Sequence, residues 1–190
     1  MSLNGVVTAV NVHPDEPTGL RSTLAPLEFG GDEQSDALVG EGVDVAEGLA
    51  LAALVVAAAF TGAAVYVNVV EHPARRTLDA RAALQEWQPA YKRGAAMQSS
   101  LALVGFVLAG VAAFLGAGVL VATGAALIIA PWPWTYLAIM PLNKQLLAMT
   151  PDTAGPDVHP MLERWETLHR VRTLLGAAAT ACLLWAALIN

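Results

Sequence analysis

The stretch GLALAALVVAAAFTGAAVYVNVVEHPAR, residues 48–75, contains a long uncharged run that ends abruptly in polar side chains. Residues 48–70 carry no charge and are long enough for an α-helix to cross a bilayer, which takes about 20 apolar residues. At 3.6 residues per turn, one face of this helix carries Thr61, Val65, Asn68, His72 and Arg75. Polar groups on such a helix are costly in lipid unless they face protein. We therefore expect this helix to form one wall of a polar pocket at a membrane surface.

Three further segments are apolar enough to span a membrane. The uncharged run from Gly94 to Asn143 is too long for one span, and Gly116-Ala117-Gly118 is the obvious tight turn within it. The last run begins at Thr173 and extends toward its N-terminus through an amphipathic stretch from Pro160. The alternative, a soluble bundle of alanine-rich helices, fits poorly with uncharged runs of this length. The predicted spans are residues 48–70, 95–115, 119–141 and 172–189.

Composition divides the chain into two parts. Overall, 56% of the residues are hydrophobic and 14% are charged, whereas a soluble domain has about 25% charged residues. Residues 1–45 are acidic, rich in Gly and Pro, and lack an apolar period, so we predict a disordered tail there. Residues 46–190 form the predicted integral membrane domain. The single Cys182 excludes an intramolecular disulfide and a cysteine metal site.

The basic residues predict the orientation in the membrane. Nine of the ten Lys and Arg lie between Arg75 and Arg172, in or beside the connections 71–93 and 142–172. The positive-inside rule makes these connections cytoplasmic and places both termini outside the plasma or inner membrane. Both connections have a helical, amphipathic pattern, typical of interfacial helices. The predicted fold is thus all-α: a four-helix transmembrane bundle with amphipathic interfacial helices on the cytoplasmic side and a disordered N-terminal tail.

Prolines occur just after the first predicted span and inside the third. Pro73 lacks an N–H, so it is predicted either to begin a new helix or to kink the first one. Pro131 and Pro133 remove backbone donors inside the third span, which is tolerated only where protein or cavity water satisfies the freed carbonyls. The neighbouring Trp132 and Trp134 fit two interpretations. They are an aromatic belt at the membrane interface, or an aromatic floor for a flat ligand.

Four motifs carry a resemblance to a known family. They are GAAVYVNVVEHPAR (62–75), WQPAYKRGAAMQ (87–98), MPLNKQLL (140–147) and ERWETLHRVRT (163–173). Over residues 48–189 the chain resembles the family of small four-span membrane proteins that includes the anthrone oxygenases. The resemblance implies oxidation of a phenolic tricyclic anthrone to an anthraquinone by O2, without a metal or flavin cofactor. The tail lies outside the resemblance.

Such chemistry needs a base for a benzylic proton and donors for the resulting enolate oxygen. His72 and His169 are candidate bases, because an unperturbed histidine titrates near neutral pH, and Tyr91 is a candidate proton relay. The candidate substrate-binding residues are Asn68, Arg75, Arg93, Gln98, Trp132, Trp134, Asn143, Trp165 and Arg172. Each histidine has an alternative as a hydrogen-bonded structural residue, and each arginine as an interfacial one. We expect Glu71 to pair with a pocket arginine and Glu166 to pair with Arg170.

Two other classes of function compete with catalysis. His72 and His169 could hold a haem or a metal from two helices, although the sequence offers no third ligand cluster. The chain could also be a non-catalytic membrane subunit or a small-molecule carrier. The partners that we expect are the lipid bilayer, an aromatic small molecule and O2, with no nucleic acid, and the sequence does not determine the oligomeric state.

Overall fold

In a computed structural model, the backbone is described for residues 32–189 and the side chains for residues 45–189. Every described secondary-structure element is a helix, which confirms the all-α class. The elements in chain order are α1 (Asp32–Tyr66), η1 (Val67–Glu71), α2 (His72–Arg75), α3 (Ala80–Phe114), α4 (Val119–Ile129), α5 (Pro131–Trp134), η2 (Thr135–Ile139), α6 (Met140–Ala148), η3 (Pro151–Thr153) and α7 (Val158–Ile189). The four-helix bundle belongs to a single unit, Val39–Asn190.

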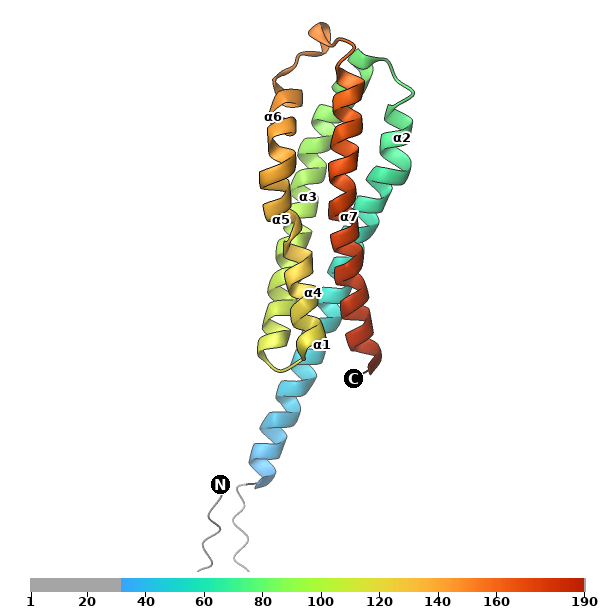
Figure 1. The fold of residues 1–190 in the computed structure, drawn as a ribbon. Coiled ribbons are helices and arrows are strands. Elements are labelled where there is room, and N and C mark those ends of the chain that lie inside the picture. The colour runs from blue at the N-terminus through green and yellow to red at the C-terminus, as the bar shows by residue number, and fades with distance from the viewer. Residues whose placement is uncertain (1–31, 190) are drawn as a thin grey trace, which may run out of the picture. The chain divides into compact units, whose positions relative to one another are not determined.

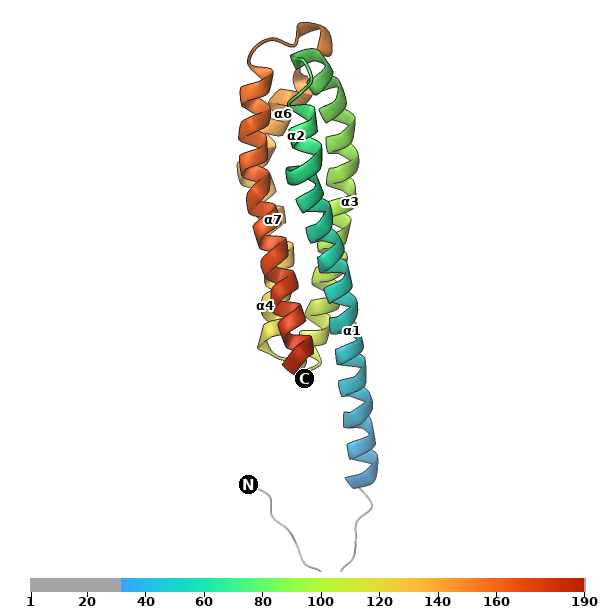
Figure 2. The ribbon, with the colours of Figure 1, turned by 90° about the vertical axis from the view of Figure 1, so that its right-hand side faces the viewer.

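Four helical rods build this unit, and Figures 1 and 2 show them side by side. By length and composition each rod can cross a membrane: Val45–Arg75, Ala80–Phe114, Val119–Ala148 and Val158–Ile189. With 30 to 35 residues each and a rise of about 1.5 Å per residue, the rods exceed the roughly 30 Å of a hydrocarbon core. The amphipathic segments that we expected at the interface are therefore continuous with the second and fourth spans.

The first helix begins earlier than we expected. α1 starts at Asp32, inside the segment 1–45 that was predicted to be a tail. No proline occurs between Pro26 and Pro73, so no residue in 32–45 forces a helix to end. The helix therefore extends by 14 residues, 32–45, into the predicted tail. The rest of the predicted tail, residues 1–31, lies outside the described residues.

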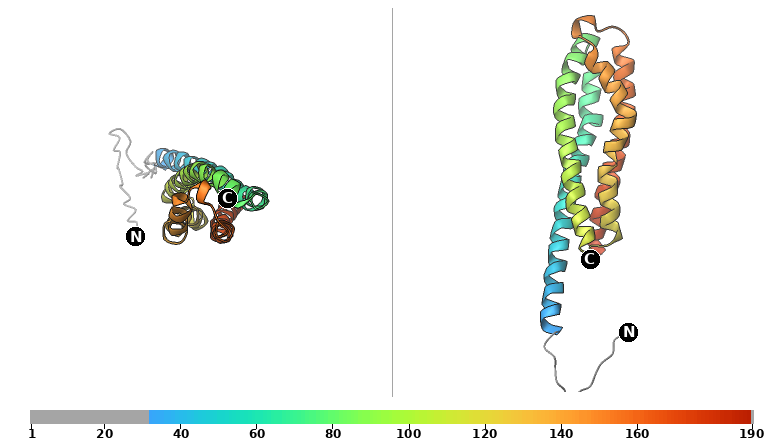
Figure 3. Two further views of the ribbon diagram at one scale, coloured as in Figure 1. Left: turned by 90° about the horizontal axis from the view of Figure 1, so that it is seen from above. Right: turned by 90° about the vertical axis from the view of Figure 1, so that its left-hand side faces the viewer.

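The bundle has an apolar end and a polar end, and each connection between the rods lies at one of them. The turn between α3 and α4 contains Gly116 and Gly118, with φ of +103° and +91°, a conformation that glycine adopts without strain. This confirms the predicted tight turn. The loops at residues 76–79 and 149–157 lie together at the opposite end (Figure 1; Figure 3, right). The polar segments of all four rods consequently meet at that end.

Small residues allow close packing in the apolar half. A Cβ added to Gly176 would lie 2.8 Å from the Phe60 ring, and one added to Gly124 would lie 2.7 Å from Leu183 Cγ. Thr61 and Thr180 share a hydrogen bond of 3.0 Å between α1 and α7. Such close approach is how membrane helices pack without a hydrophobic driving force between them. A second core, containing Trp87, Leu146 and Trp165, fills the polar half.

Two π-helical turns reposition residues in the polar half. In η1 the His72 N–H bonds to Val67 O, and in η2 the Met140 N–H bonds to Thr135 O. Each turn comes just before a proline, Pro73 or Pro141. A proline gives no N–H and its ring clashes with the carbonyl four residues back. The wider π turn accommodates that carbonyl, so the rod continues instead of ending.

The extra residue in η1 changes which side chains are buried. Two helical turns span about seven residues, so residue 71 would follow the buried Ala64 on the inner face of a regular helix. Instead His72 is buried and Glu71 is half-buried. The predicted face was also wrong at Val65, which precedes the π turn and is 41% exposed next to the buried Ala64.

Candidate functional site

A cluster of polar side chains is buried in the polar half of the bundle. Its members, none more than 8% exposed, are His72, Arg75, Gln98, Asn143, Glu166, His169 and Arg172. They come from all four rods. Buried polar and charged groups are costly unless they are paired, so the contacts of this cluster define what it can do.

Arg172 on α7 lies at the centre of the cluster. It donates to Thr135 Oγ1 at 2.8 Å and to Gln98 Oε1 at 2.9 Å, and its guanidinium carbon lies 5.9 Å from the centre of the Phe60 ring. Its Nε is buried and has no partner among the described residues. The two bonds fix the planar guanidinium and use two of its five N–H groups.

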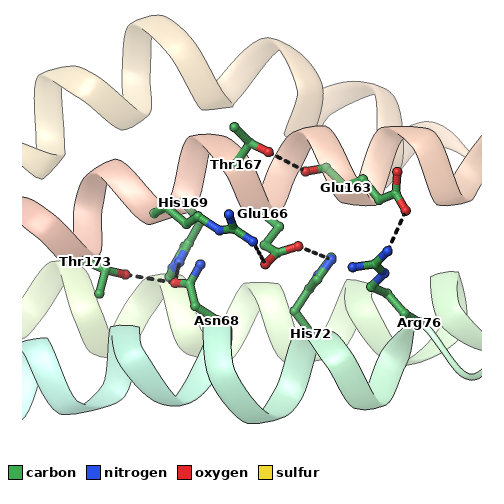
Figure 4. Close-up of polar contacts among 9 residues, drawn as sticks. Asn68, His72, Arg76, Glu163, Glu166, Thr167, His169 and Thr173 are labelled. Atoms are coloured by element: carbon green, nitrogen blue, oxygen red, sulfur yellow. Dashed lines mark hydrogen bonds and ion pairs between the residues drawn. The ribbon is translucent and has the colours of Figure 1, made fainter.

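His169 is held one turn before Arg172. Its Nδ1 lies 2.8 Å from Asn68 Oδ1, which also accepts a hydrogen bond from Thr173 Oγ1 at 2.8 Å (Figure 4). Because an amide oxygen only accepts, the proton of a neutral His169 resides on Nδ1. Its Nε2 then carries a lone pair, which is the form that a general base requires.

Asn143 connects two aromatic side chains. It donates to the Tyr91 hydroxyl at 3.0 Å and accepts from Trp165 Nε1 at 2.9 Å. Since the Tyr91 oxygen is the acceptor in that bond, its O–H remains free to donate. The ring of Trp165 stacks on His169 at 4.9 Å, and Trp87 stacks on Tyr91 at 4.9 Å. The result is an aromatic wall with polar atoms at defined positions.

A second group of charges lies beside this wall. His72 Nε2 is 2.9 Å from Glu166 Oε2, although the contact lacks the alignment of a hydrogen bond. Arg170 pairs with the other oxygen of Glu166 at 2.6 Å, which confirms the expected Glu166–Arg170 pair. We had not expected the His72 contact. Both histidines considered as haem or metal ligands therefore hold side-chain partners, His72 with Glu166 and His169 with Asn68.

Arg75 is neutralised by two carboxylates. It forms ion pairs with Glu71, four residues earlier, and with Glu86 on α3. The predicted pairing of Glu71 with a cluster arginine is confirmed. The side chain of Arg75 is only 1% exposed, whereas that of Glu86 is 41% exposed, so the pair joins the buried cluster to its polar surroundings.

Two cavities adjoin the cluster. The inner cavity, about 50 Å³, is lined by Val67, Glu71, Trp87, Ala90, Tyr91, Gly94, Ala95, Gln98, Ile139, Asn143, Trp165, His169 and Arg172. The outer cleft, about 340 Å³ and more open, is lined by Tyr91, Ala95, Ala96, Ser99, Pro131, Trp132, Thr135, Tyr136, Met140 and Arg172. Tyr91, Ala95 and Arg172 line both and form the junction between them.

The structure brings most of the predicted site residues together, but not all in the same way. Those that line a cavity are Tyr91, Gln98, Trp132, Asn143, Trp165, His169 and Arg172. Asn68 does not line the inner cavity but is hydrogen-bonded to His169, which does. His72 and Arg75 are buried but line neither cavity, so His72 is not placed to act as the base.

Two predicted substrate-binding residues lie elsewhere. Arg93 is exposed and lines neither of the two cavities, which corrects its expected convergence with the cluster. Trp134 donates from Nε1 to Leu168 O at 3.0 Å and thereby ties α5 to α7. Its neighbour Trp132 does line the outer cleft. The two tryptophans of one motif thus have different roles.

The sequence did not reveal three residues of the site. Trp87 was not among the predicted site residues, but it is fully buried and stacks on Tyr91. Thr135 and Phe60 gave no polar or spacing signal, and both contact Arg172. Within residues 45–189 there is no group of three or more His, Cys, Asp or Glu side chains arranged to hold a metal ion.

Four rods that can each cross a membrane, with a buried polar cluster and its cavities in one half of the bundle, define a small helical membrane protein with a polar pocket. The chain belongs to the anthrone oxygenase family, whose family model, described as "Anthrone oxygenase", matches residues 87–182, just over half of the 190 residues. The match includes Tyr91, Asn143, His169 and Arg172. No curated protein and no solved structure shows a significant match to the chain.

Proposed function

We propose that the protein is a cofactor-independent oxygenase that converts an anthrone, or a similar enolisable phenolic compound, to the quinone with O2. One observation carries the proposal: His169, whose Nε2 has no partner among the described residues, lines the inner cavity, and Arg172 and Tyr91, which carry further N–H and O–H donors, line both cavities. This combination provides a base and an oxyanion site next to aromatic walls. Membership of the family supports the same reaction class.

His169 is the proposed general base. Its tautomer is held by Asn68, and its ring is held by stacking on Trp165. A base must reach the proton that it removes, directly or through one water. The inner cavity, about 50 Å³, is large enough for water-sized molecules, each of which needs about 10–15 Å³ of such volume. His169 therefore acts on a substrate carbon at the junction, directly or through one water.

Arg172 and Tyr91 are the proposed oxyanion donors. Removal of a benzylic proton moves negative charge onto the carbonyl oxygen, and donors that are already in place stabilise that charge without reorganisation. Arg172 and Tyr91 line both cavities, and the Tyr91 O–H and the Arg172 N–H groups beyond those that donate to Thr135 and Gln98 are not used in other contacts among the described residues. Thr135, Gln98 and Asn143 are positioning residues that hold these two donors.

The reaction balances with O2 as the only oxidant. His169 takes one benzylic proton, and the enolate passes one electron to O2. The resulting radical pair forms a C–O bond, and protonation of the terminal oxygen by the histidinium gives a hydroperoxide. Loss of the second benzylic proton breaks the O–O bond, forms the new carbonyl and releases water. One anthrone and one O2 give one anthraquinone and one water.

Proton abstraction can be tested without oxygen. In anaerobic D2O, protein in bilayers should accelerate exchange of the benzylic hydrogens of anthrone, followed by NMR, over protein-free bilayers. His169→Gln removes the base and should lower the accelerated rate by about 100-fold or more. Arg93→Gln, at an exposed position outside both cavities, is the matched control and should exchange as the wild type does. Equal exchange by wild type and His169→Gln would remove histidine base catalysis.

A further inference from the structure

We propose that the outer cleft between α3 and the α5–η2 segment is the binding site for the ring system of a planar tricyclic ligand, and that it opens sideways to the bilayer. The inference rests on the proposed function, because it gives that substrate a location and an entrance. Three observations carry it: the sizes of the two cavities, the polar atoms at their junction, and the depth of the cleft along the rods.

Size separates the roles of the two cavities. The inner cavity of about 50 Å³ has space for a few water-sized molecules or O2, and not for three fused rings. The outer cleft of about 340 Å³ falls in the range of ligand sites, about 300–1,000 Å³. A tricyclic ligand must therefore place its body in the outer cleft and only its reacting edge at the junction.

The base of the cleft is polar where an oxygen of the ligand would arrive. Arg172 lines the cleft, and its Nη1 and Nη2 each carry a further N–H beyond those that donate to Thr135 and Gln98. Tyr91 lies beside it with a free O–H. A donor that a bound ligand buries without a partner costs about 1–3 kcal/mol, so a ligand that presents an acceptor to these N–H and O–H groups is favoured there. The remaining walls, including Ala95, Pro131 and Met140, are apolar and suit a flat ring.

The depth of the cleft places its mouth at the level of the lipid interface. Eight of the ten lining residues lie at 95–99 or 131–140, toward the two ends of the uncharged run from Gly94 to Asn143, and the exposed Lys92 and Lys144 lie just outside that run. Lysines that flank a span mark the head-group level. Trp132 and Tyr136 line the cleft and are 45% and 73% exposed, as expected of aromatic side chains at the interface. A phenolic aromatic compound dissolved in the bilayer reaches this mouth without leaving the lipid.

Binding can be measured with a ligand that cannot react. Anthraquinone has no benzylic hydrogen, and as an electron acceptor it quenches tryptophan fluorescence. We expect saturable quenching when it is titrated into bilayers that contain the protein. Trp132→Phe should remove a large part of this signal. Ala96→Phe fills the outer cleft from an exposed position and should raise the half-saturating concentration by about tenfold or more, with helical circular dichroism unchanged.

A matched variant and a second cleft-filling variant complete the design. Ala177→Phe also replaces an exposed alanine, on α7 and outside both cavities, and should bind as the wild type does. If Ala96→Phe does not fold, Ser99→Phe tests the same cleft. Wild-type affinity in the folded cleft variant, or equal loss in Ala177→Phe, would overturn the inference.

The same preparations separate this inference from the proposed function. Saturable binding that Ala96→Phe weakens, without any oxidation of anthrone by the wild type, supports the cleft and contradicts only the oxygenase. Wild-type oxidation rates in Ala96→Phe at low anthrone concentration support the oxygenase and contradict the cleft.

Discussion

Some residues in the polar half make more than one side-chain contact, and Asn143 is the clearest example. It is fully buried, and its amide bonds to both Tyr91 and Trp165. Asn143→Leu keeps the branching and the number of side-chain heavy atoms but leaves the Trp165 N–H unpaired. We expect a loss of about 1–3 kcal/mol of stability, seen as a lower thermal midpoint in detergent micelles. Lys144→Leu, at the exposed neighbouring position, should leave the midpoint unchanged, and equal midpoints in both variants would contradict the role of the amide.

Individual residues also show how much of the candidate site could be predicted from the sequence. The polar residues of the four motifs stood out because charges and amides are rare in membrane spans, and most of them do meet in one cluster. Burial of Arg75 beside Glu71 followed from helical spacing and charge. Arg93 could not be distinguished from Arg75 in this way. Both arginines lie near the end of a span, and whether each one is buried depends on how the neighbouring rods pack against it.

At the scale of elements, close contact between α1 and α7 depends on a single glycine. A Cβ at Gly176 would lie 2.8 Å from the Phe60 ring and 2.9 Å from Thr61 Oγ1. Because an aromatic ring in a packed core has little room to move, Gly176→Ala should destabilise the bundle by about 1–3 kcal/mol. Gly62→Ala, whose Cβ would meet no atom within 4 Å, is the control for the change in helix propensity. A midpoint for Gly176→Ala at or above that of Gly62→Ala would show that the helices simply move apart.

The helical elements were predictable in number and approximate position, but the π turns were not. Uncharged runs and the glycine turn define four rods by length alone. Pro73 and Pro141 could each end a helix, kink it or follow a π turn. Which of these occurs depends on which side chains the neighbouring rods can bury, and the sequence of one segment does not contain that information. The consequence is large, because the extra residue in η1 turns His72 rather than Glu71 toward the core. π turns within α-helices occur frequently at functional sites, and both lie at the cluster here.

At the scale of the whole molecule, the apolar and polar halves of the bundle predict its orientation. The loops at 76–79 and 149–157 share the polar end with nearly all of the basic residues. We propose that this end is cytoplasmic. Reporter fusions at Pro156 and after Asn190 should then report the cytoplasmic and the external side, respectively. The reverse pair of signals would invert the topology and place the cluster at the outer surface.

The oxygenase reaction itself is the central claim, and its stoichiometry tests it most directly. Purified wild-type protein in bilayers is supplied with anthrone, and O2 uptake and anthraquinone formation are recorded together against protein-free bilayers. We predict one O2 consumed and one anthraquinone formed per anthrone, at a rate that increases in proportion to the protein and falls to the background in His169→Gln. Wild-type rates no higher than those of protein-free bilayers, across a range of enolisable phenols, would contradict the account.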